Sequence, residues 1–255
     1  GKSLILSNIL KKRVQVCMED IVYKNKVILF TLFITTIFIF HRPGFPKGVP
    51  ALKNIDDVLS EVEKANAAFK TMKADMTFTR TITLLESTEV SQGEMSYKKP
   101  KRLYLKFYPP RNEINIVDGR YVWVYHPAEK QVEKYDMDKG KQSSQGLSFF
   151  EFGYGESVNS ARKDYTITLL ETKEDGKKRF YVLDLLPKDP KSQYSGIRLW
   201  IEEGFWLPGR IELYESTGEV VNVIDLKNIK LNKGMSDKLF MFDVPKGVEV
   251  IEPLK

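Results

Sequence analysis

The sequence predicts an α+β fold that is mainly β, with one amphipathic helix followed by a meandering, strongly curved antiparallel sheet. Three observations predict it. Apolar residues recur every three or four positions over residues 55–72, which is the period of one helix face. From about residue 75 the period changes to two, and runs of this kind continue to residue 231. Turn residues of the Asp-Gly type separate many of these runs, which is typical of hairpins.

The helix is expected to begin at Asn54 or Asp56, because either side chain can accept hydrogen bonds from the first unpaired amide groups. Its back is charged, and its apolar stripe consists of Ile55, Val58, Leu59, Val62, Ala65, Phe69 and Met72. A stripe of this kind has to be buried, so we expect the helix to lie on the sheet.

Strands are expected along most of the remaining chain. The first alternating run is Met76, Phe78, Ile82 and Leu84, after which Ser91–Gly93 are expected to turn the chain. Later runs are Leu103–Phe107, Tyr121–Tyr125, Tyr165–Leu170, Phe180–Leu186, Gly196–Glu202, Arg210–Tyr214 and Val220–Leu231. Many runs are apolar on one face and partly apolar on the other, which favours a curved sheet with an enclosed concave face.

One segment, residues 142–155 (QSSQGLSFFEFGYG), does not alternate. Its large side chains crowd between glycines and are Leu147, Phe149, Phe150, Phe152 and Tyr154. Two interpretations stay open for it: a helical cover or aromatic flap over the concave face, or a simple plug in the core.

The charge of the protein is unevenly distributed. The net charge is +6, and residues 1–50 hold eight of the 40 basic and two of the 34 acidic residues. The remaining 32 basic and 32 acidic residues therefore balance over residues 51–255. A neutral main domain has no electrostatic attraction to the phosphates of nucleic acid, so we expect no nucleic-acid partner.

Residues 1–50 are expected to form an N-terminal extension that directs export. Val27–Phe40 (VILFTLFITTIFIF) carries no charge and follows Lys24 and Lys26, as in a secretory signal peptide. It is shorter than the roughly 20 residues that span a bilayer as a helix. The following stretch, HRPGFPKGVPA, offers no clear cleavage site, so an uncleaved anchor in the inner membrane is the alternative. Met18 is a candidate translation start.

No catalytic motif is present. The sequence has no Walker lysine motif, no GxSxG and no HExxH. The single cysteine, Cys17, excludes an internal disulfide and a cysteine-rich metal site. His41 and His126 are the only histidines, which leaves few groups for acid–base chemistry. We therefore expect neither catalytic residues nor a metal or other cofactor.

Three segments, in order, resemble the LolA family of periplasmic lipoprotein carriers. Gly93–Phe107 (GEMSYKKPKRLYLKF) is similar to the family's strand, basic–proline turn and next strand. Ile116–Tyr135 (IVDGRYVWVYHPAEKQVEKY) is similar to its hairpin and following polar strand. Phe240–Ile251 (FMFDVPKGVEVI) is similar to its closing segment. With the initial helix, the resemblance covers roughly residues 52–252.

The resemblance implies an incomplete, unclosed antiparallel β-barrel over residues 51–255, with covering helices over a hydrophobic cavity. It implies a carrier in the periplasm, which receives acylated lipoproteins from an inner-membrane ABC-type exporter and delivers them to an outer-membrane acceptor. We expect such a carrier to be a monomer. The alternative is a membrane-tethered sensor or regulator, or a (glyco)lipid-binding protein, of the same fold.

The resemblance also implies which residues contact acyl chains. The cavity wall is expected at Leu59, Val62, Leu103, Leu105, Phe107, Trp123 and Tyr125, and the lid at Leu147, Phe149, Phe150 and Phe152. Ordinary core packing is the alternative for all of them. Lys99 occupies a position where the family often has an arginine that controls the lid. Lysine lacks the planar fork of arginine. Three interpretations stay open: Lys98, Lys99 or Arg102 substitutes for the arginine, lid control differs here, or the basic turn is simply solvated.

Overall fold

The computed structural model describes residues 53–137, 154 and 157–253. The predicted export segment at 27–40 and the predicted lid residues Leu147, Phe149, Phe150 and Phe152 lie outside the described residues.

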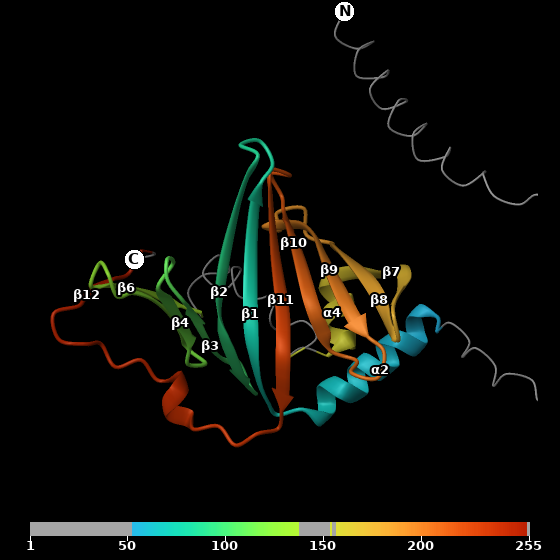
Figure 1. The fold of residues 1–255 in the computed structure, drawn as a ribbon, viewed down its shortest axis with the longest axis horizontal. Coiled ribbons are helices and arrows are strands. Elements are labelled where there is room, and N and C mark those ends of the chain that lie inside the picture. The colour runs from blue at the N-terminus through green and yellow to red at the C-terminus, as the bar shows by residue number, and fades with distance from the viewer. Residues whose placement is uncertain (1–52, 138–153, 155–156, 254–255) are drawn as a thin grey trace, which may run out of the picture. The chain divides into compact units, whose positions relative to one another are not determined.

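The described residues form one open sheet of twelve strands (Figure 1). The strands are β1 (Thr71–Ile82), β2 (Ser87–Lys98), β3 (Arg102–Phe107), β4 (Glu113–Val117), β5 (Tyr121–His126), β6 (Gln131–Asp136), β7 (Tyr165–Asp175), β8 (Lys178–Pro187), β9 (Tyr194–Glu202), β10 (Pro208–Glu215), β11 (Val220–Leu231) and β12 (Glu249–Ile251). Their order is β12-β6-β5-β4-β3-β2-β1-β11-β10-β9-β8-β7. Neighbours are antiparallel except β12 and β6, which are parallel. Because β7 and β12 are edges, the barrel is incomplete, as predicted.

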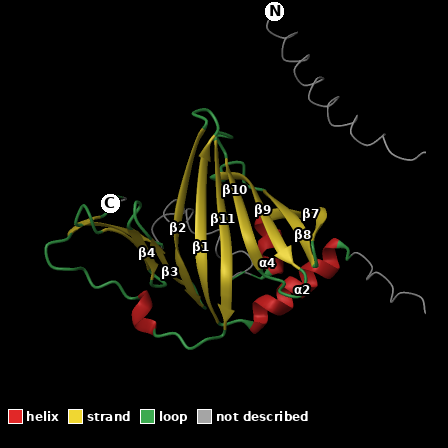
Figure 2. Ribbon diagram, viewed as in Figure 1, coloured by secondary structure: helices red, strands yellow, loops and turns green. Residues whose placement is uncertain are grey.

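Three helical segments accompany the sheet (Figure 2): α2 (Ile55–Ala68), α4 (Val158–Asp164) and the 3₁₀ turn η2 (Asp237–Phe240). Helix α2 begins where the sequence predicts, because the side chain of Asn54 accepts a 2.9 Å hydrogen bond from the backbone N–H of Asp57. The prediction extended this helix too far. Phe69 caps its C-terminus in an extended conformation, and Met72 already belongs to β1.

The first hairpin corrects a second prediction. The chain turns at residues 83–86, and Ser91–Gly93 lie inside β2, paired with residues 76–78 of β1. Glycine is needed at position 93 for lack of space and not for a turn. A Cβ atom there would collide with the backbone carbonyl oxygen of Lys106 on β3. The glycine therefore marks a close approach of two strands.

The hydrophobic core lies between the concave face of the sheet and the two α-helices. Val58, Leu59 and Val62 of α2 enter it together with Val158 and Ala161 of α4. The sheet contributes alternate residues, among them Leu183, Leu185, Ile197, Leu199, Ile201 and Ile211, none more than 1% exposed. The apolar stripe of the predicted helix is thus buried on the sheet, as expected.

Tyr154, from the aromatic segment of the sequence, is completely buried in this core. Its ring meets that of Phe69 edge-on, with centroids 6.0 Å apart. Its hydroxyl donates a hydrogen bond to the carbonyl oxygen of Pro208 on β10, so its one polar atom is satisfied. Tyr154 itself is therefore held between the end of α2 and β10.

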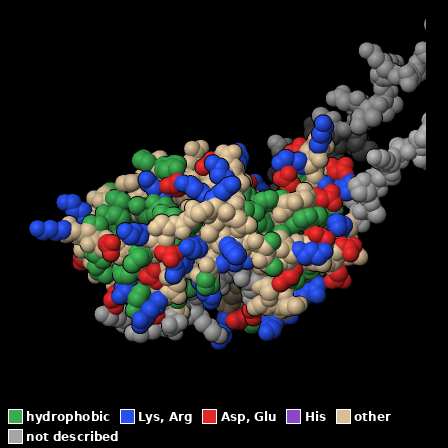
Figure 3. Space-filling view, turned by 90° about the horizontal axis from the view of Figure 1, so that it is seen from below, with side chains coloured by type: hydrophobic (Ala, Val, Ile, Leu, Met, Phe, Trp, Pro, Cys, Tyr) green, Lys and Arg blue, Asp and Glu red, His purple; other side chains and the backbone are tan. Residues whose placement is uncertain are grey.

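The surface of the described part carries mixed charge. Figure 3 shows basic and acidic side chains interspersed over the face seen from below, in keeping with the neutral balance of residues 51–255. Within the described ranges, none of the helices has the length and apolar character needed to cross a membrane.

Candidate functional site

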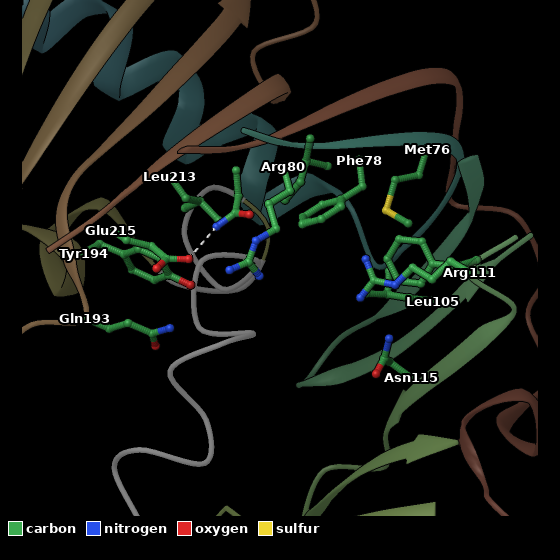
Figure 4. Close-up of a pocket in the computed structure, with 13 residues that line it drawn as sticks. Met76, Phe78, Arg80, Leu105, Arg111, Asn115, Gln193, Tyr194, Leu213 and Glu215 are labelled. Carbon is green, nitrogen blue, oxygen red and sulfur yellow. Dashed lines mark hydrogen bonds between the residues drawn. The ribbon is translucent and has the colours of Figure 1, made fainter. Parts of the chain in front are cut away.

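A pocket of about 220 Å³ opens on the concave face of the sheet, between the β1–β11–β10 side and the β3–β4 side (Figure 4). Its apolar lining consists of Met76, Phe78, Leu105, Phe107, Leu213 and Ile224. Its polar lining consists of Arg80, Arg111, Asn115, Gln193, Tyr194, Glu215 and Asn222. The pocket therefore combines an apolar floor with a polar rim.

Strand alternation builds the floor. Met76 and Phe78 are two residues apart on β1, so they point to the same face, and Phe78 pairs with Ile224 of β11. Leu105 and Phe107 repeat this spacing on β3. The rings of Phe78 and Phe107 meet edge-on with centroids 5.9 Å apart, across the position where Gly93 has no side chain. The floor is thus one continuous apolar surface from β11 to β3.

Hydrogen bonds order part of the rim. Arg111 Nη2 and Asn115 Nδ2 each donate a 2.8 Å hydrogen bond to Glu113 Oε1. At the other end of the pocket, Asn222 Nδ2 donates a 3.1 Å hydrogen bond to Glu215 Oε1. Burial, aided by the negative charge of Glu215, raises the pKa of Tyr194 to about 12, so this phenol is neutral at physiological pH.

A second pocket, of about 620 Å³, adjoins the first toward the tip of the β1–β2 hairpin. Its lining is Phe78, Arg80, Glu89, Val90, Ser91, Pro110 and Arg111. Three residues, Phe78, Arg80 and Arg111, line both pockets. The concave face therefore has a narrow inner pocket and a wider outer one, with an aromatic ring and two guanidinium groups where they meet.

Of the residues predicted to form the cavity wall, Leu105 and Phe107 line the inner pocket. Leu103 of the same strand is 3% exposed and belongs to the core. Leu59 and Val62 also pack in the core, under α2, and line neither of the two pockets. Leu105 and Phe107 belong to the same buried core cluster, at 3% and 4% exposed, so on β3 core packing and pocket lining occur together.

Trp123 and Tyr125, also predicted to form the cavity wall, line neither of the two pockets. Their strand neighbours Val122 and Val124 join the core cluster, so the alternation of β5 turns the two aromatic residues to the opposite face. There both rings lie 5.4 Å from the ring of Phe242, and Trp123 Nε1 donates a 3.0 Å hydrogen bond to Asp118.

Lys99 contacts the covering helix. Its ammonium group donates hydrogen bonds to the backbone carbonyl and to Oδ1 of Asn66, the latter at 2.8 Å, and lies 4.2 Å from the ring centroid of Phe69. Burial lowers the pKa of Lys99, against the opposing influence of the Glu63 carboxylate. Lys99 therefore secures the C-terminal end of α2. The basic turn is not merely solvated.

Sequence reasoning missed Met76, Phe78, Arg80 and Arg111 as site residues. The alternation of β1 is visible in the sequence and places Met76, Phe78 and Arg80 on one face. No pattern in the sequence indicates that this face forms the pocket together with β3. Arg111 lies in the loop between β3 and β4, where periodicity carries no information.

The described part offers little for catalysis or metal binding. His126 Nδ1 is 3.8 Å from a carboxylate oxygen of Glu113, and its Nε2 is 3.9 Å from one of Glu133. Both distances exceed those of hydrogen bonds. Among residues 53–137, 154 and 157–253, no three His, Cys, Asp or Glu side chains gather as metal ligands would.

Comparison with known proteins gives consistent matches. A family model described as "Outer membrane lipoprotein carrier protein LolA" matches residues 67–243. An uncharacterized protein of Methanocaldococcus jannaschii is 26% identical over 208 residues, covering 81% of this chain and 56% of that protein. The chain thus spans little more than half of that relative's length. An outer-membrane lipoprotein carrier protein of Legionella pneumophila is 29% identical over 187 residues, covering 72% and 85%.

Among solved structures, an uncharacterized conserved protein from Thermus thermophilus superposes with a TM-score of 0.50 at 13% identity, over 77% of this chain and 98% of that one. At this identity the likeness concerns the fold alone. The family model, in contrast, spans more than half of the chain and includes β1, β3 and β11, the strands of the pocket floor. The chain belongs to the LolA family of outer membrane lipoprotein carrier proteins.

Proposed function

We propose that this protein is a periplasmic carrier that binds the acyl chains of lipoproteins in the pockets of its concave face and moves them from the inner to the outer membrane. The observation that carries the proposal is the continuous apolar floor from Ile224 to Leu105, open to the wider outer pocket. Membership in the LolA family supports it, as does the name of the Legionella relative.

The physical chemistry of the cargo explains why such a floor is needed. Each exposed CH₂ group of an acyl chain costs about 0.8 kcal/mol in water, so a lipoprotein does not leave a membrane unless its chains are covered. A carrier also has to release the cargo. Met76 on the floor has a flexible, polarisable side chain that adapts to chains of different shape, and the open pockets leave a path for departure.

The proposal also names the partners of the carrier and the compartment in which it acts. An inner-membrane ABC-type exporter would load the carrier, and an outer-membrane acceptor would unload it. Residues 27–40 would direct export to the periplasm, either as a cleaved signal or as an anchor in the inner membrane. The carrier would act as a monomer by binding alone, without covalent chemistry on its cargo.

A release assay tests the proposal. The full chain is mixed with inner-membrane vesicles that hold the exporter and a labelled acylated lipoprotein, and the supernatant is examined for a soluble complex. Phe78→Glu places a charge on the floor, and Thr79→Glu places the same charge on the opposite face of β1. We expect release with the wild type and with Thr79→Glu, and loss of release with Phe78→Glu.

The absence of a complex would overturn the proposal, provided that two controls hold. Circular dichroism must show that the wild-type protein is folded, and the exporter must release lipoprotein to another carrier. Equal release by both glutamate variants would show instead that lipoprotein is held elsewhere than on this floor.

A further inference from the structure

We propose that the cargo carries an anionic group, a phosphate or a carboxylate, and that Arg80 and Arg111 bind this group where the two pockets meet. The inference rests on the proposed acyl-binding function and deepens it, because it names a chemical feature of the cargo that an apolar floor does not require. Figure 4 shows both guanidinium groups directed into the pocket, from opposite sides.

The position of the two arginines is the first argument. Both line the inner pocket and the outer pocket, together with Phe78 alone. Consider an amphiphile whose chains lie on the floor and whose polar end reaches the outer pocket. The point where its chains join the polar end must lie beside Arg80 and Arg111. A neutral chain gains nothing from two positive charges there, whereas an anion gains charge-assisted hydrogen bonds from both.

Arg80 has hydrogen-bond donors that are not in use. Within the described ranges it has neither an ion pair nor a hydrogen bond, although it is half-buried and pairs across the strands with Asn222 and Glu89. Glu89 also lines the outer pocket, but it is exposed and forms no ion pair with Arg80. A guanidinium has five N–H donors, so Arg80 can bind an incoming anion through two parallel hydrogen bonds.

Arg111 is positioned differently but to the same effect. Its guanidinium lies 3.8 Å from the ring centroid of Phe107 and 5.2 Å from that of Phe78, so it rests on the apolar floor. One of its N–H groups binds Glu113, which fixes its orientation and leaves the others available. A guanidinium that rests on two rings and is still accessible is well placed to bind an anion that arrives with an acyl chain.

Glu113 forms a 2.8 Å ion pair with Arg111 and offsets part of its charge, whereas Arg80 has no ion pair within the described ranges. Glu113 is shared between Arg111 and Asn115, and Glu215 accepts from Asn222 at the far end of the inner pocket. Glu215 lines the inner pocket only, whereas Arg80, Arg111 and Phe78 stand at the junction of the two pockets. The anionic group is assigned to that junction.

Equilibrium binding of short-chain lipids by the full chain tests the inference. Dihexanoyl phosphatidylglycerol is anionic, dihexanoyl phosphatidylcholine has the same chains without net charge, and inorganic phosphate has the charge without the chains. The variants are Arg80→Gln and Arg111→Gln. Arg80→Lys retains the charge, and Arg120→Gln is a matched control because it removes an exposed arginine outside both pockets.

We expect phosphatidylglycerol to bind at least about tenfold more tightly than phosphatidylcholine, and each pocket variant to lose about tenfold, the effect of one charge-assisted hydrogen bond. Arg120→Gln should bind as the wild type does, Arg80→Lys should retain part of the preference, and added salt should weaken the preference. Inorganic phosphate alone should bind far more weakly than the lipid.

Equal binding of the two lipids would overturn the inference and leave the acyl carrier intact. Binding of neither lipid by a folded protein would overturn both, because the inference depends on the carrier function. Inorganic phosphate that binds as tightly as phosphatidylglycerol would identify a site for free anions and contradict an amphiphilic cargo.

Discussion

Lys99 donates a 2.8 Å hydrogen bond to Oδ1 of Asn66, and this contact joins the turn between β2 and β3 to the last turn of α2. The same ammonium group also reaches the backbone carbonyl of Asn66, one of the acceptors that a helix C-terminus leaves unpaired. A residue of this turn thereby satisfies the end of the covering helix. The contact adds to the burial of Val58, Leu59 and Val62, which also holds α2 against the core.

Replacing Lys99 by Met keeps the length of the side chain and removes its donors. Asn66, which is 5% exposed, then loses these two hydrogen bonds, so the free energy of unfolding should fall by about 1–3 kcal/mol. Urea denaturation followed by circular dichroism measures the change. Lys177→Met, at an exposed turn, is the control and should change stability little. An unchanged midpoint for Lys99→Met would contradict the role given to this contact.

The lowered pKa of Lys99 predicts a pH dependence. The unfolded chain keeps its proton up to the ordinary pKa of 10.5, whereas burial lowers the folded pKa. Between these two values the unfolded state binds more protons, so the contribution of Lys99 to stability rises with pH. The difference in unfolding free energy between wild type and Lys99→Met should therefore increase as the pH approaches 10.5. A difference that decreases over this range would contradict the burial of the charge.

Gly93 predicts a sharp steric effect. A methyl group at this position meets the carbonyl oxygen of Lys106, which is backbone and yields only if β2 and β3 separate. Gly93→Ala should lower the free energy of unfolding by about 1–3 kcal/mol, the usual cost of overpacking. Gly209→Ala, also on a strand but with open space around the new methyl group, should be nearly neutral. Equal thermal midpoints for the two variants would contradict the close approach of the strands.

Phe242 fixes the segment after η2 over the outer face of β5. Its ring contacts Trp123 and Tyr125, so Phe242→Ala should cost about 2 kcal/mol and change the fluorescence of Trp123. Urea titration with tryptophan fluorescence gives both values. Val244→Ala is the control, because that side chain is 42% exposed. Unaltered fluorescence and stability in Phe242→Ala would show that the segment is not held there.

The periodicity of apolar residues predicts much of the fold. The helix start at Asn54, the alternating strands and the curvature of the sheet follow from the spacing of apolar residues and from local capping, which are properties of neighbouring residues. That the sheet stays open was predicted from the family resemblance. The turn placed at Ser91–Gly93 was wrong because a glycine inside a strand can serve a close approach, which depends on Lys106, a residue of another strand.

The site was predicted less well, for a related reason. Leu105 and Phe107 were identified through the family resemblance, and they do line the inner pocket. Trp123 and Tyr125 lie on the other face of β5. Both faces of this strand are apolar, so its sequence does not tell which face is buried; the contacts of Val122 with the core and of Trp123 with Phe242 decide it. Arg80 and Arg111 line the same pockets only because β1, β2 and β3 pair, which no local pattern specifies.

The central claim, that acyl chains lie on the concave floor, is tested most directly by photo-crosslinking. p-Benzoylphenylalanine replaces Phe78 in the pocket or Thr79 on the opposite face of β1, and each full-length variant is irradiated with a lipoprotein labelled on its acyl chains. The account predicts a labelled adduct from position 78 and none from position 79. Adducts from position 79 alone, or none from position 78 in a folded protein that still releases lipoprotein, would contradict it.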